Sequence, residues 1–510
     1  MGYLLGLDIG TSSVKAAIIN KDGKTITIER SSGHTFSCLH GGWAEEDPVD
    51  WWVGCQDTIA KSLISGGISA GEIDCIGLSA QMHSLVPLDE NFELVRTSIL
   101  HCDSRSGRQA KNLRALLQDD HIMNNIVKNP IHTGYTLPSL LWVRENEPDV
   151  YKSIRHIMLP ADYIRFRLTG EYGTDHSDAS ATLAYDYTSA GWSELILNMV
   201  NVPVEFFPKI YNSAEIAGTI TKKAEKETGL RAGTPVVFGG ADQVMQSIGC
   251  GSIEQGQATV NIGSSTQVCL QINNPISSPK KGINCFCSYK SDKWYLMGAN
   301  TNGGSTFKWF CNEILQNSDL SAIDNQVSSV MPGCNGLVFL PYLSGERCPH
   351  LNADISGVFW GLSYLTDRAR MARAVMEGIV FSMYNCLLIC ETSGITPEVL
   401  IAIGGGAGSK VWLQIQADIY GRPLTVTASS EQAVLGAAIT AGVGCGAFSS
   451  FAEGCKCTVH YKDIIEPNLN NHKKYLEYFK IFNDIYSLAL PALEAVTVLG
   501  RNDTNEIAKT

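Results

Sequence analysis

Short apolar runs alternate with amphipathic segments along the first half of the chain. Residues 3–9 and 14–20 are largely apolar and are followed by an Asp-Gly turn, which predicts neighbouring buried strands. Residues 48–65 carry tryptophan and aliphatic side chains near helical spacing, and residues 73–79 predict another buried strand. Strands that alternate with helices in this way are typical of an α/β protein.

The second half predicts a matching hairpin. Residues 258–263 and 266–270 again form two short strands, and residues 8–12 (DIGTS) align with residues 261–265 (NIGSS). Five positions can match by chance, yet the repeat favours two domains of similar architecture. We expect an N-terminal domain at 1–245, a C-terminal domain at 246–450, and a helical extension and tail at 451–510.

The remaining elements of the second half also follow from the pattern. Residues 398–403 predict a strand that runs into a glycine turn, and residues 410–420 predict a helix. Residues 432–442 are mostly small, which predicts a helix that packs closely against its neighbours. Residues 473–499 predict a final helix, and residues 501–510 predict a polar tail that frays.

Composition and charge restrict the partners of this 510-residue chain. Its 39 Lys and Arg and 51 Asp and Glu give a net charge of −12, which disfavours nucleic acid. The apolar runs are shorter than the ~18–20 residues of a membrane span, and the N-terminus does not read as a signal peptide. We therefore expect a cytoplasmic protein with neither nucleic acid nor a membrane as partner, and a homodimer stays open.

The 16 cysteines do not form a zinc framework. Close pairs such as Cys285 and Cys287 lack the second pair at defined spacing that zinc sites need. His34, Cys38 and His40 form only a loose cluster. The pattern predicts reduced thiols.

The 48 glycines gather at strand ends. One Gly-Thr-Ser tip between two strands is often an ordinary hairpin, but glycine also lets the backbone approach a ligand closely. Successive N–H groups and hydroxyls can then bind one anionic group. Two such tips, at residues 10–12 and 263–265, favour a ligand with several phosphates held between two domains. The glycine turns at residues 303–304 and 404–407 suit nucleotide contact or a simple helix entry.

Two aspartates follow predicted strands. Asp8 precedes the first glycine tip, where a carboxylate suits a Mg²⁺ ion beside phosphates, or else caps the turn. Asp242 follows the apolar strand 234–238 and a Gly-Gly turn. From spacing alone it fits a helix cap and a general base for phosphoryl transfer equally well.

Polar residues near residue 80 suit an acceptor with hydroxyl groups. His83 follows a strand end and can donate and accept hydrogen bonds, although a lone histidine is more often structural. Asp103 and Arg105 fit a polyol or an ion pair with each other. Trp43 fits a sugar-stacking residue or a core residue.

Together these motifs resemble the FGGY carbohydrate kinases, and within that family the xylulose kinase branch. The resemblance covers the chain from residue 1 to about 442 and rests on ordered motifs rather than on any single one. The motifs are LDIGTS (7–12), QMH (81–83), GAD (240–242), PYLSGER (341–347) and GGGA (404–407).

The resemblance implies a two-domain actin-like ATPase fold, of ribonuclease H-like type, with a central cleft that holds ATP, Mg²⁺ and a sugar. Asp242 matches the family's catalytic base, and Asp8 matches the acidic residue near Mg²⁺. The positions that would bind the sugar are Met82, His83, Asp103, Arg105, Asp242 and Gln243. Those that would bind the nucleotide are Gly10, Thr11, Ser12, Gly263, Ser264, Ser265, Gly303, Gly304, Gly405, Gly406 and Ala407.

The sugar-binding motifs depart from the branch more than the catalytic ones do. Xylulose kinases usually have glycine where this chain has Ser84, asparagine where it has Gln243, and Trp-Asn where it has His101-Cys102. We expect an ATP-dependent sugar kinase with D-xylulose as first acceptor and D-xylulose 5-phosphate as product. Gluconate, ribulose and polyols stay open as acceptors, and so does a catalytically silent nucleotide-binding regulator.

Overall fold

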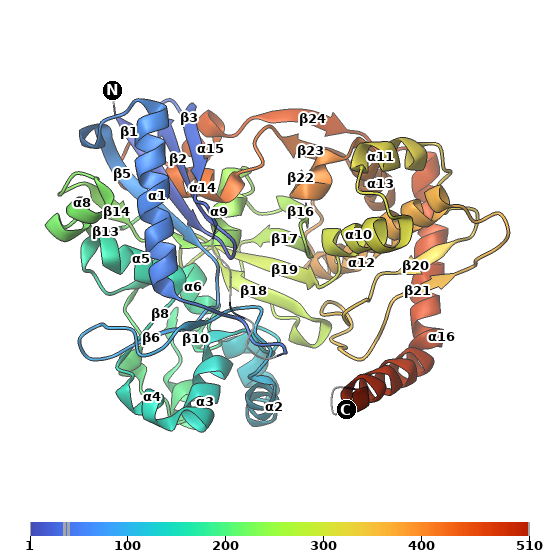
Figure 1. Cartoon of the computed structure of the whole chain (residues 1–510), viewed down its shortest axis with the longest axis horizontal. Helices are drawn as coiled ribbons and strands as arrows, with labels where there is room; N and C mark the ends of the chain where they lie inside the picture. Colours follow the sequence, from blue (N-terminus) through green and yellow to red (C-terminus); the bar gives the residue numbers. More distant parts are fainter. Residues whose placement is uncertain (1, 34–36, 38–40, 508–510) are drawn as a thin grey trace.

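Two lobes, each built around a seven-stranded sheet, make up the chain (Figure 1). The structure is a computed structural model, in which residues 2–33, 37 and 41–507 are described. His34, Cys38 and His40 lie outside the described residues. The other cysteines are free thiols, which agrees with the predicted reduced state.

The first sheet carries the first predicted hairpin. Its strands run in the order β13 (Ile216–Thr219), β14 (Pro235–Val237), β5 (Ile73–Ala80), β1 (Tyr3–Ile9), β2 (Val14–Asn20) and β3 (Thr25–Arg30), with β15 (Gly240–Ala241) also paired with β5. The helices α1 (Pro48–Gly66), α5 (Pro160–Thr169) and α8 (Lys222–Thr228) contribute to the apolar core on one face of this sheet.

The second sheet carries the second hairpin. Its strands run in the order β18 (Ile283–Cys287), β19 (Trp294–Asn300), β17 (Thr266–Ile272), β16 (Ala258–Ile262), β22 (Leu400–Ile403), β23 (Leu424–Thr427) and β24 (Tyr461–Ile465). The helices α12 (Arg368–Glu391) and α13 (Lys410–Tyr420) supply much of the core around it.

The two sheets share one topology over six strands. The order β3-β2-β1-β5-β14-β13 corresponds to β19-β17-β16-β22-β23-β24, and each pair of neighbours is parallel or antiparallel in the same way. Asp8 on β1 pairs with Lys15, and Asn261 on β16 pairs with Gln267. The similarity of the two halves, which rested on five residues of sequence, is therefore present throughout both sheets.

Helix α14 (Gln432–Gly444) belongs to the second half of the chain but packs on the first sheet. A Cβ at Gly6 would lie 2.2 Å from the Val434 carbonyl oxygen, and one at Gly77 would lie 1.9 Å from that of Ala437. Only glycine in the strands lets the helix backbone approach so closely. The small-residue helix predicted at 432–442 thus packs as closely as expected. The domain limits predicted from the sequence stay a prediction.

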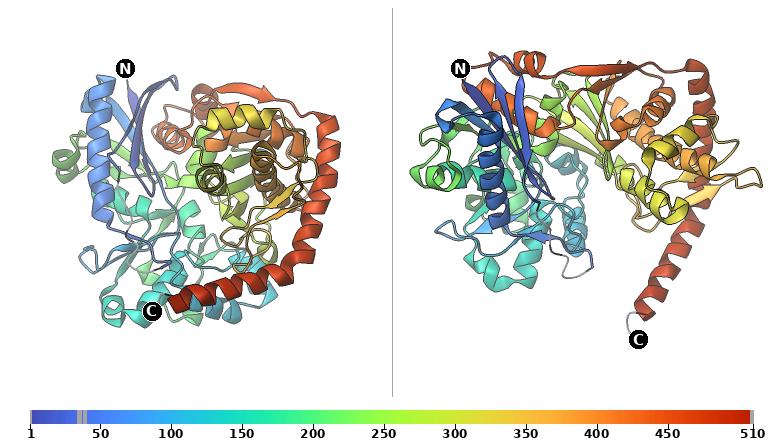
Figure 2. Two further views of the ribbon diagram at one scale, coloured as in Figure 1. Left: turned by 45° about the vertical axis from the view of Figure 1, so that its right-hand side comes forward. Right: turned by 45° about the horizontal axis from the view of Figure 1, so that its top comes forward.

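The C-terminal helix α16 (Leu469–Ile507) is longer than predicted, because it continues through residues expected to fray. Figure 2 shows it along the outer edge of the second lobe and extending beyond that lobe. Pro491 lies inside it, and a proline removes one helical hydrogen bond and favours a bend.

Two helices among the described residues, α12 and α16, are long and apolar enough to cross a membrane by length and composition alone. In α12, 78% of the most apolar window is buried inside the structure, as in a core helix. In the most apolar window of Leu469–Gly500, in α16, the buried share is 17%. These two helices are weak evidence for a membrane span, since core helices of soluble proteins pass the same test.

Candidate active site

Three cavities adjoin one another, and residues of both lobes line two of them. The histidine cavity is lined by Met82, His83, His101, His132, Tyr135, Asp242, Gln243, Gln267, Arg347 and neighbours. The carboxylate cavity is lined by Asp8, Gly10, Lys15, Asp242, Gln243, Gln246, Asn261, Gln267 and residues 430–433. The glycine-loop cavity is lined by residues 403–405, 407–408, 426–430, Gln432 and Lys462. Asp242 lines the first two, and Ser430 and Gln432 line the last two. The cavities therefore adjoin one another, and Asp242 lies at the junction of the first two.

Asp242 is the first residue of helix α9 (Asp242–Gly249), directly after β15. Its Oδ1 accepts a hydrogen bond of 2.8 Å from the Gln243 backbone N–H in the first turn of the helix, whose N-cap residue is Ala241. Burial and the negative charge of Asp8 raise the pKa of Asp242 to about 7, against a smaller lowering by that hydrogen bond. A carboxylate with a pKa near neutrality is well suited to accept a proton from a substrate.

Asp8 faces the carboxylate cavity from the end of β1. Its Oδ1 accepts a hydrogen bond of 2.7 Å from the Ser79 hydroxyl, which fixes the carboxylate against β5. Burial raises the pKa of Asp8, while the Ser79 hydrogen bond and the Lys15 charge oppose the rise. Two carboxylates in one cavity repel each other unless a cation lies between them.

The oxygen atoms around this cavity fit Mg²⁺. The side-chain Oδ1 of Asn261 is buried and has no hydrogen-bond partner among the described residues, and it lines the cavity together with Asp8 and Asp242. Mg²⁺ prefers oxygen ligands, and one or two carboxylates with waters and phosphates are its usual set. No cluster of three or more His, Cys, Asp and Glu side chains suited to a metal occurs in the described part of the chain. The cavity thus suits a Mg²⁺ shared with phosphates rather than an all-protein metal cage.

The glycine turns converge at the second hairpin tip. The Gly304 backbone N–H donates to the Gly263 carbonyl (2.8 Å), and a Cβ at Gly303 would lie 2.5 Å from the Ser265 carbonyl carbon. Gly404 has a positive φ of 77°, and a Cβ there would lie 2.2 Å from Asn261 Oδ1. Ser264 and Ser265 stay exposed at the tip.

The first tip makes a similar turn. The Gly10 N–H donates to the Ser13 carbonyl (3.2 Å), as the Gly263 N–H does to that of Ser265 (3.0 Å). Gly10 lines the carboxylate cavity, Thr11 is half-buried and Ser12 is exposed. Gly405 and Ala407 line the glycine-loop cavity, and Gly406 packs on Ile262.

The histidine cavity holds four of the six residues predicted to bind the sugar, namely Met82, His83, Asp242 and Gln243. His83 has a positive φ of 72°, which is uncommon for a residue with a side chain and is found at functional sites. Its Nδ1 lies 2.6 Å from the Ala181 carbonyl oxygen. This contact holds the ring in place.

Three imidazoles and one guanidinium line the histidine cavity, namely those of His83, His101, His132 and Arg347. Burial, together with the Arg347 charge, lowers the pKa of His83 to about 3, that of His101 to about 4 and that of His132 to about 3. Positive charge on His101 or His132 would lower the pKa of His83 further. The rings are therefore neutral at pH 7, and each can donate or accept a hydrogen bond.

Asp103 and Arg105 lie outside the histidine cavity and pair with each other. The Asp103 carboxylate accepts from the Ala44 N–H (2.6 Å) and from Arg105, whose guanidinium also binds Glu45 (2.5 Å) and lies 3.9 Å from the centre of the Trp43 ring. The sequence left open whether Asp103 and Arg105 bind a polyol or pair with each other, and the structure favours the ion pair. Trp43 likewise contacts Arg105 and Trp142 rather than the cavity.

Several lining residues were not predicted as site residues. Asn261 could have been found, because it aligns with Asp8 in the sequence repeat. In the sequence, His101 stands out only as a departure from a family motif, and Arg347 only as part of another motif. His132 lies in a non-periodic segment after Pro130, where no sequence pattern marks it.

Comparisons with known proteins agree with this geometry. The models of the N-terminal and C-terminal domains of the FGGY family of carbohydrate kinases match residues 3–249 and 258–445. A xylulose kinase of Bacillus subtilis is 32% identical over 487 residues, which are 96% of this chain and 97% of that one. The structure of ligand-bound xylulose kinase from Lactobacillus acidophilus matches with a TM-score of 0.91, at 25% identity, over 97% of this chain and 100% of that one.

A gluconate kinase structure from Lactobacillus acidophilus is equally similar, with a TM-score of 0.91 at 26% identity over 97% of this chain and 99% of that one. The expected two-domain α/β actin-like ATPase fold is confirmed by these structures. So is the expected enzyme class, an ATP-dependent sugar kinase. By sequence and by structure, the chain belongs to the FGGY family of carbohydrate kinases.

Proposed function

We propose that this enzyme transfers the γ-phosphoryl group of ATP to a hydroxyl group of D-xylulose and releases D-xylulose 5-phosphate and ADP. The observation that carries the proposal is the place of Asp242, at the junction of the histidine and carboxylate cavities. An acceptor in the first cavity and phosphates in the second would meet at this carboxylate. The most similar relatives reported above include xylulose kinases.

The chain's own residues suit an in-line transfer. Asp242 accepts the proton of the attacking hydroxyl while that oxygen bonds to the γ-phosphorus, and the bond to the bridging oxygen of ADP breaks. The tips at residues 10–12 and 263–265 bind phosphate oxygens through backbone N–H groups and hydroxyls. A Mg²⁺ held near Asp8 would neutralise phosphate charge. His83, Met82 and Gln243 orient the acceptor, so that only one hydroxyl reaches Asp242.

The rate should depend on pH through Asp242. A base works only when ionised, and the pKa of Asp242 is raised to about 7. We therefore expect kcat/KM to be constant above neutrality and to fall about tenfold per pH unit below it. A pH–rate profile in the free-enzyme limit measures this. A profile that stays flat down to pH 5 would show that a different group, or none, takes the proton.

An acceptor panel tests the reaction and the acceptor together. ADP release is measured by a coupled assay with ATP, Mg²⁺ and, in turn, D-xylulose, D-ribulose, D-gluconate, glycerol and no sugar. We expect D-xylulose to give the highest kcat/KM, with little ADP release in its absence. Another preferred sugar would overturn the acceptor but not the reaction. ATP binding without any sugar-dependent ADP release would instead favour a silent regulator.

A sugar acid is the second candidate acceptor, and the lining of the histidine cavity supports it. His83, His101, His132 and Arg347 surround one space, and an anionic group there would gain hydrogen bonds from imidazoles and the charge of a guanidinium. In the same panel, D-gluconate would then exceed D-xylulose. Replacing His132 with leucine should lower kcat/KM for gluconate more than for xylulose, because leucine donates no hydrogen bond.

We infer a cytoplasmic location from the supply of ATP and from the free thiols of the described cysteines, which are usual in a reducing compartment. We also propose that the enzyme forms a homodimer. Exposed apolar side chains on α16, such as Leu488 and Leu499, support an association of this kind.

A further inference from the structure

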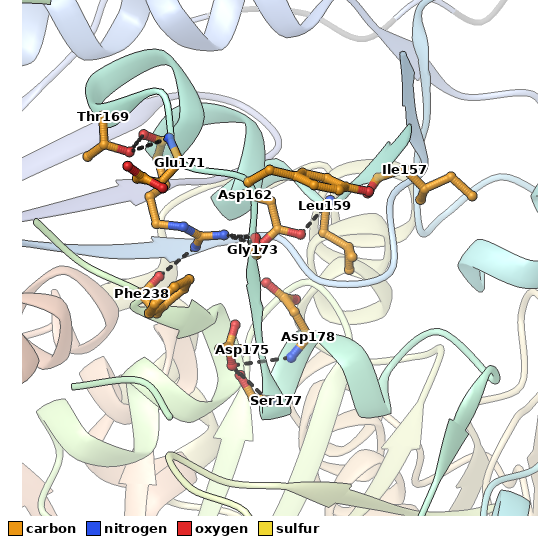
Figure 3. Close-up of polar contacts among 12 residues, drawn as sticks. Ile157, Leu159, Asp162, Thr169, Glu171, Gly173, Asp175, Ser177, Asp178 and Phe238 are labelled. Carbon is orange, nitrogen blue, oxygen red and sulfur yellow. Dashed lines mark hydrogen bonds and ion pairs between the residues drawn. The ribbon is translucent and has the colours of Figure 1, made fainter. Parts of the chain in front are cut away.

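A buried polar network lies behind the strand that leads to Asp242. It involves β15, helix α6 (His176–Ser180) and helix α5. Figure 3 shows the side chains of Asp162, Asp175, Asp178 and Ser177 gathered in this part of the first lobe, with interactions from Asp175 to Ser177 and Asp178. Each of these four side chains is at most 1% exposed. None of them lines the three cavities described above.

Ser177 connects this network to the catalytic strand. Its hydroxyl oxygen accepts a hydrogen bond of 3.0 Å from the backbone N–H of Ala241, the residue before Asp242. The other side of the strand pairs with β5, where Gly240 lies opposite Ser79 and Ala241 opposite Ala80. Ser177 therefore fixes β15 on the side away from the sheet.

Asp175 sets the direction of the Ser177 hydroxyl. The hydroxyl donates its only proton to Asp175 Oδ1, which also accepts from the Ser177 backbone N–H at 2.8 Å. A hydroxyl that has given its proton to a carboxylate presents lone pairs in its other directions. The Ala241 N–H meets one of these lone pairs, so the contact with Asp175 secures the contact with Ala241.

The same segment is held at its start by Arg165. The guanidinium donates to the Phe238 carbonyl oxygen (2.8 Å) and pairs with Asp162 (2.7 Å). Between the two anchors lie Gly239, with a positive φ of 72°, and Gly240, where a Cβ would lie 2.7 Å from Ser177 Oγ. Glycines permit this path but do not stiffen it. The rigidity of this path therefore comes from the contacts around it. These are the pairing with β5, the hydrogen bond from the Gly239 N–H to the Ser213 carbonyl oxygen (2.9 Å), and the buried side chains of Ser177 and Arg165.

We propose that Ser177, oriented by Asp175, is a positioning residue for Asp242. This inference rests on the proposed role of Asp242 as the base. A general base acts only within hydrogen-bond reach of the proton that it removes, and a misplacement by about 1 Å can cost roughly 100-fold in rate. The Ser177 hydroxyl holds the backbone one residue before that base.

The test is Ser177→Ala, with Ser180→Ala as its matched control. Ser180 lies on the same helix, is equally buried, and likewise accepts from a backbone N–H, that of Cys287 (3.0 Å). Both variants lose a buried hydroxyl, but only one loses a contact to β15. We expect Ser177→Ala to lower kcat roughly 10-fold to 100-fold with little change in KM for the acceptor. Ser180→Ala should keep kcat near that of the parent enzyme.

The pH profile adds a readout that general destabilisation would not change. The pKa of Asp242 depends on its burial first, and then on its place relative to Asp8 and the Gln243 N–H. The acid limb of the pH–rate profile should therefore move in Ser177→Ala and stay in Ser180→Ala. Equal kcat and equal acid limbs in the two variants would overturn the proposal. Asp242→Asn is measured alongside. If it retains turnover, the base assignment fails; if it is inactive while Ser177→Ala is normal, the positioning role alone fails.

A second pair of variants keeps the test decisive if Ser177→Ala does not fold. In Asp175→Asn the amide oxygen can still accept from Ser177, whereas Asp175→Ala removes that acceptor. We expect the asparagine variant to retain most of kcat and the alanine variant to lose roughly 10-fold or more. Equal losses in both would show that the charge of Asp175, and not its orientation of Ser177, is what matters.

Discussion

Replacing Asp242 with asparagine is expected to lower kcat by about 10²-fold to 10⁴-fold, the usual contribution of a general base. Asparagine keeps the shape of the side chain and can still accept from the Gln243 N–H, so helix α9 should begin where it does now. It has no basic oxygen for the proton of the attacking hydroxyl. Steady-state ADP release with saturating acceptor measures the loss, and equilibrium binding of ATP checks that the nucleotide side is intact.

Asp178→Asn is the matched control for this variant. Asp178 is as buried as any residue of the first lobe, and burial with three nearby carboxylates, Asp242 among them, raises its pKa well above the ordinary value. A raised pKa favours the neutral carboxyl group, which asparagine resembles in shape and in its lack of charge. The control should keep kcat within about threefold of the parent enzyme. Turnover of Asp242→Asn at the level of this control would show that Asp242 is not the base.

Replacing Gly436 with alanine is expected to destabilise the enzyme strongly. A Cβ at Gly436 in α14 would lie 1.8 Å from the Met245 carbonyl oxygen in α9. A Cβ at Gly249 in α9 would come equally close to the Gln432 carbonyl oxygen in α14. Alanine favours a helix by up to about 1 kcal/mol over glycine. Overpacking a tight contact costs about 1–3 kcal/mol or more, and here the obstacle is rigid backbone. We expect a net loss of about 2 kcal/mol or more in the free energy of unfolding.

Urea unfolding measures this effect, and Gly107→Ala is the control. Gly107 begins helix α2 (Gly107–Leu116), and a Cβ there would meet only a methyl group of Thr133 at 4.0 Å. That variant should change the free energy of unfolding by less than about 1 kcal/mol. Because α9 begins with Asp242, Gly436→Ala should also lower kcat. An unfolding midpoint equal to that of Gly107→Ala would mean that the two helices separate without cost.

The sequence predicts much of the fold because its strands are buried and its turns are glycine-rich. The hairpins at β1–β2 and β16–β17, helix α1 and helix α13 lie where periodicity places them. The packing of α14 on the opposite lobe could not be predicted in the same way. Small residues in the helix showed that it would pack closely, but its partners, Gly6 and Gly77, are glycines far away in the sequence.

The candidate site can likewise be predicted only in part from the sequence. Asp8, Asp242 and the glycine turns stand at strand ends, where sequence motifs are visible. The structure places Asp8, Gly10, Asp242 and part of the turn at residues 404–408 around adjoining cavities, whereas residues 263–265 and 303–304 line none of the three. The sequence leaves Asp103 and Arg105 open as acceptor residues or as an ion pair, and the contacts of Arg105 with Glu45 and Trp43 depend on tertiary structure. His132 reaches the cavity from an irregular segment. No local pattern in the sequence could have placed it there.

The shared topology of the two sheets bears on the direction in which ATP lies in the cleft. Two equivalent hairpins would, if chemically equal, offer the triphosphate two opposite orientations. The equivalent positions differ, however, since Asp8 carries a carboxylate and Asn261 a neutral amide. If a cation lies near Asp8 as proposed, we expect the γ-phosphate end beside this carboxylate and the nucleoside end beside the glycine loop. One charge difference between the two similar halves would then give the cleft a polarity, and with it a single productive orientation of the nucleotide.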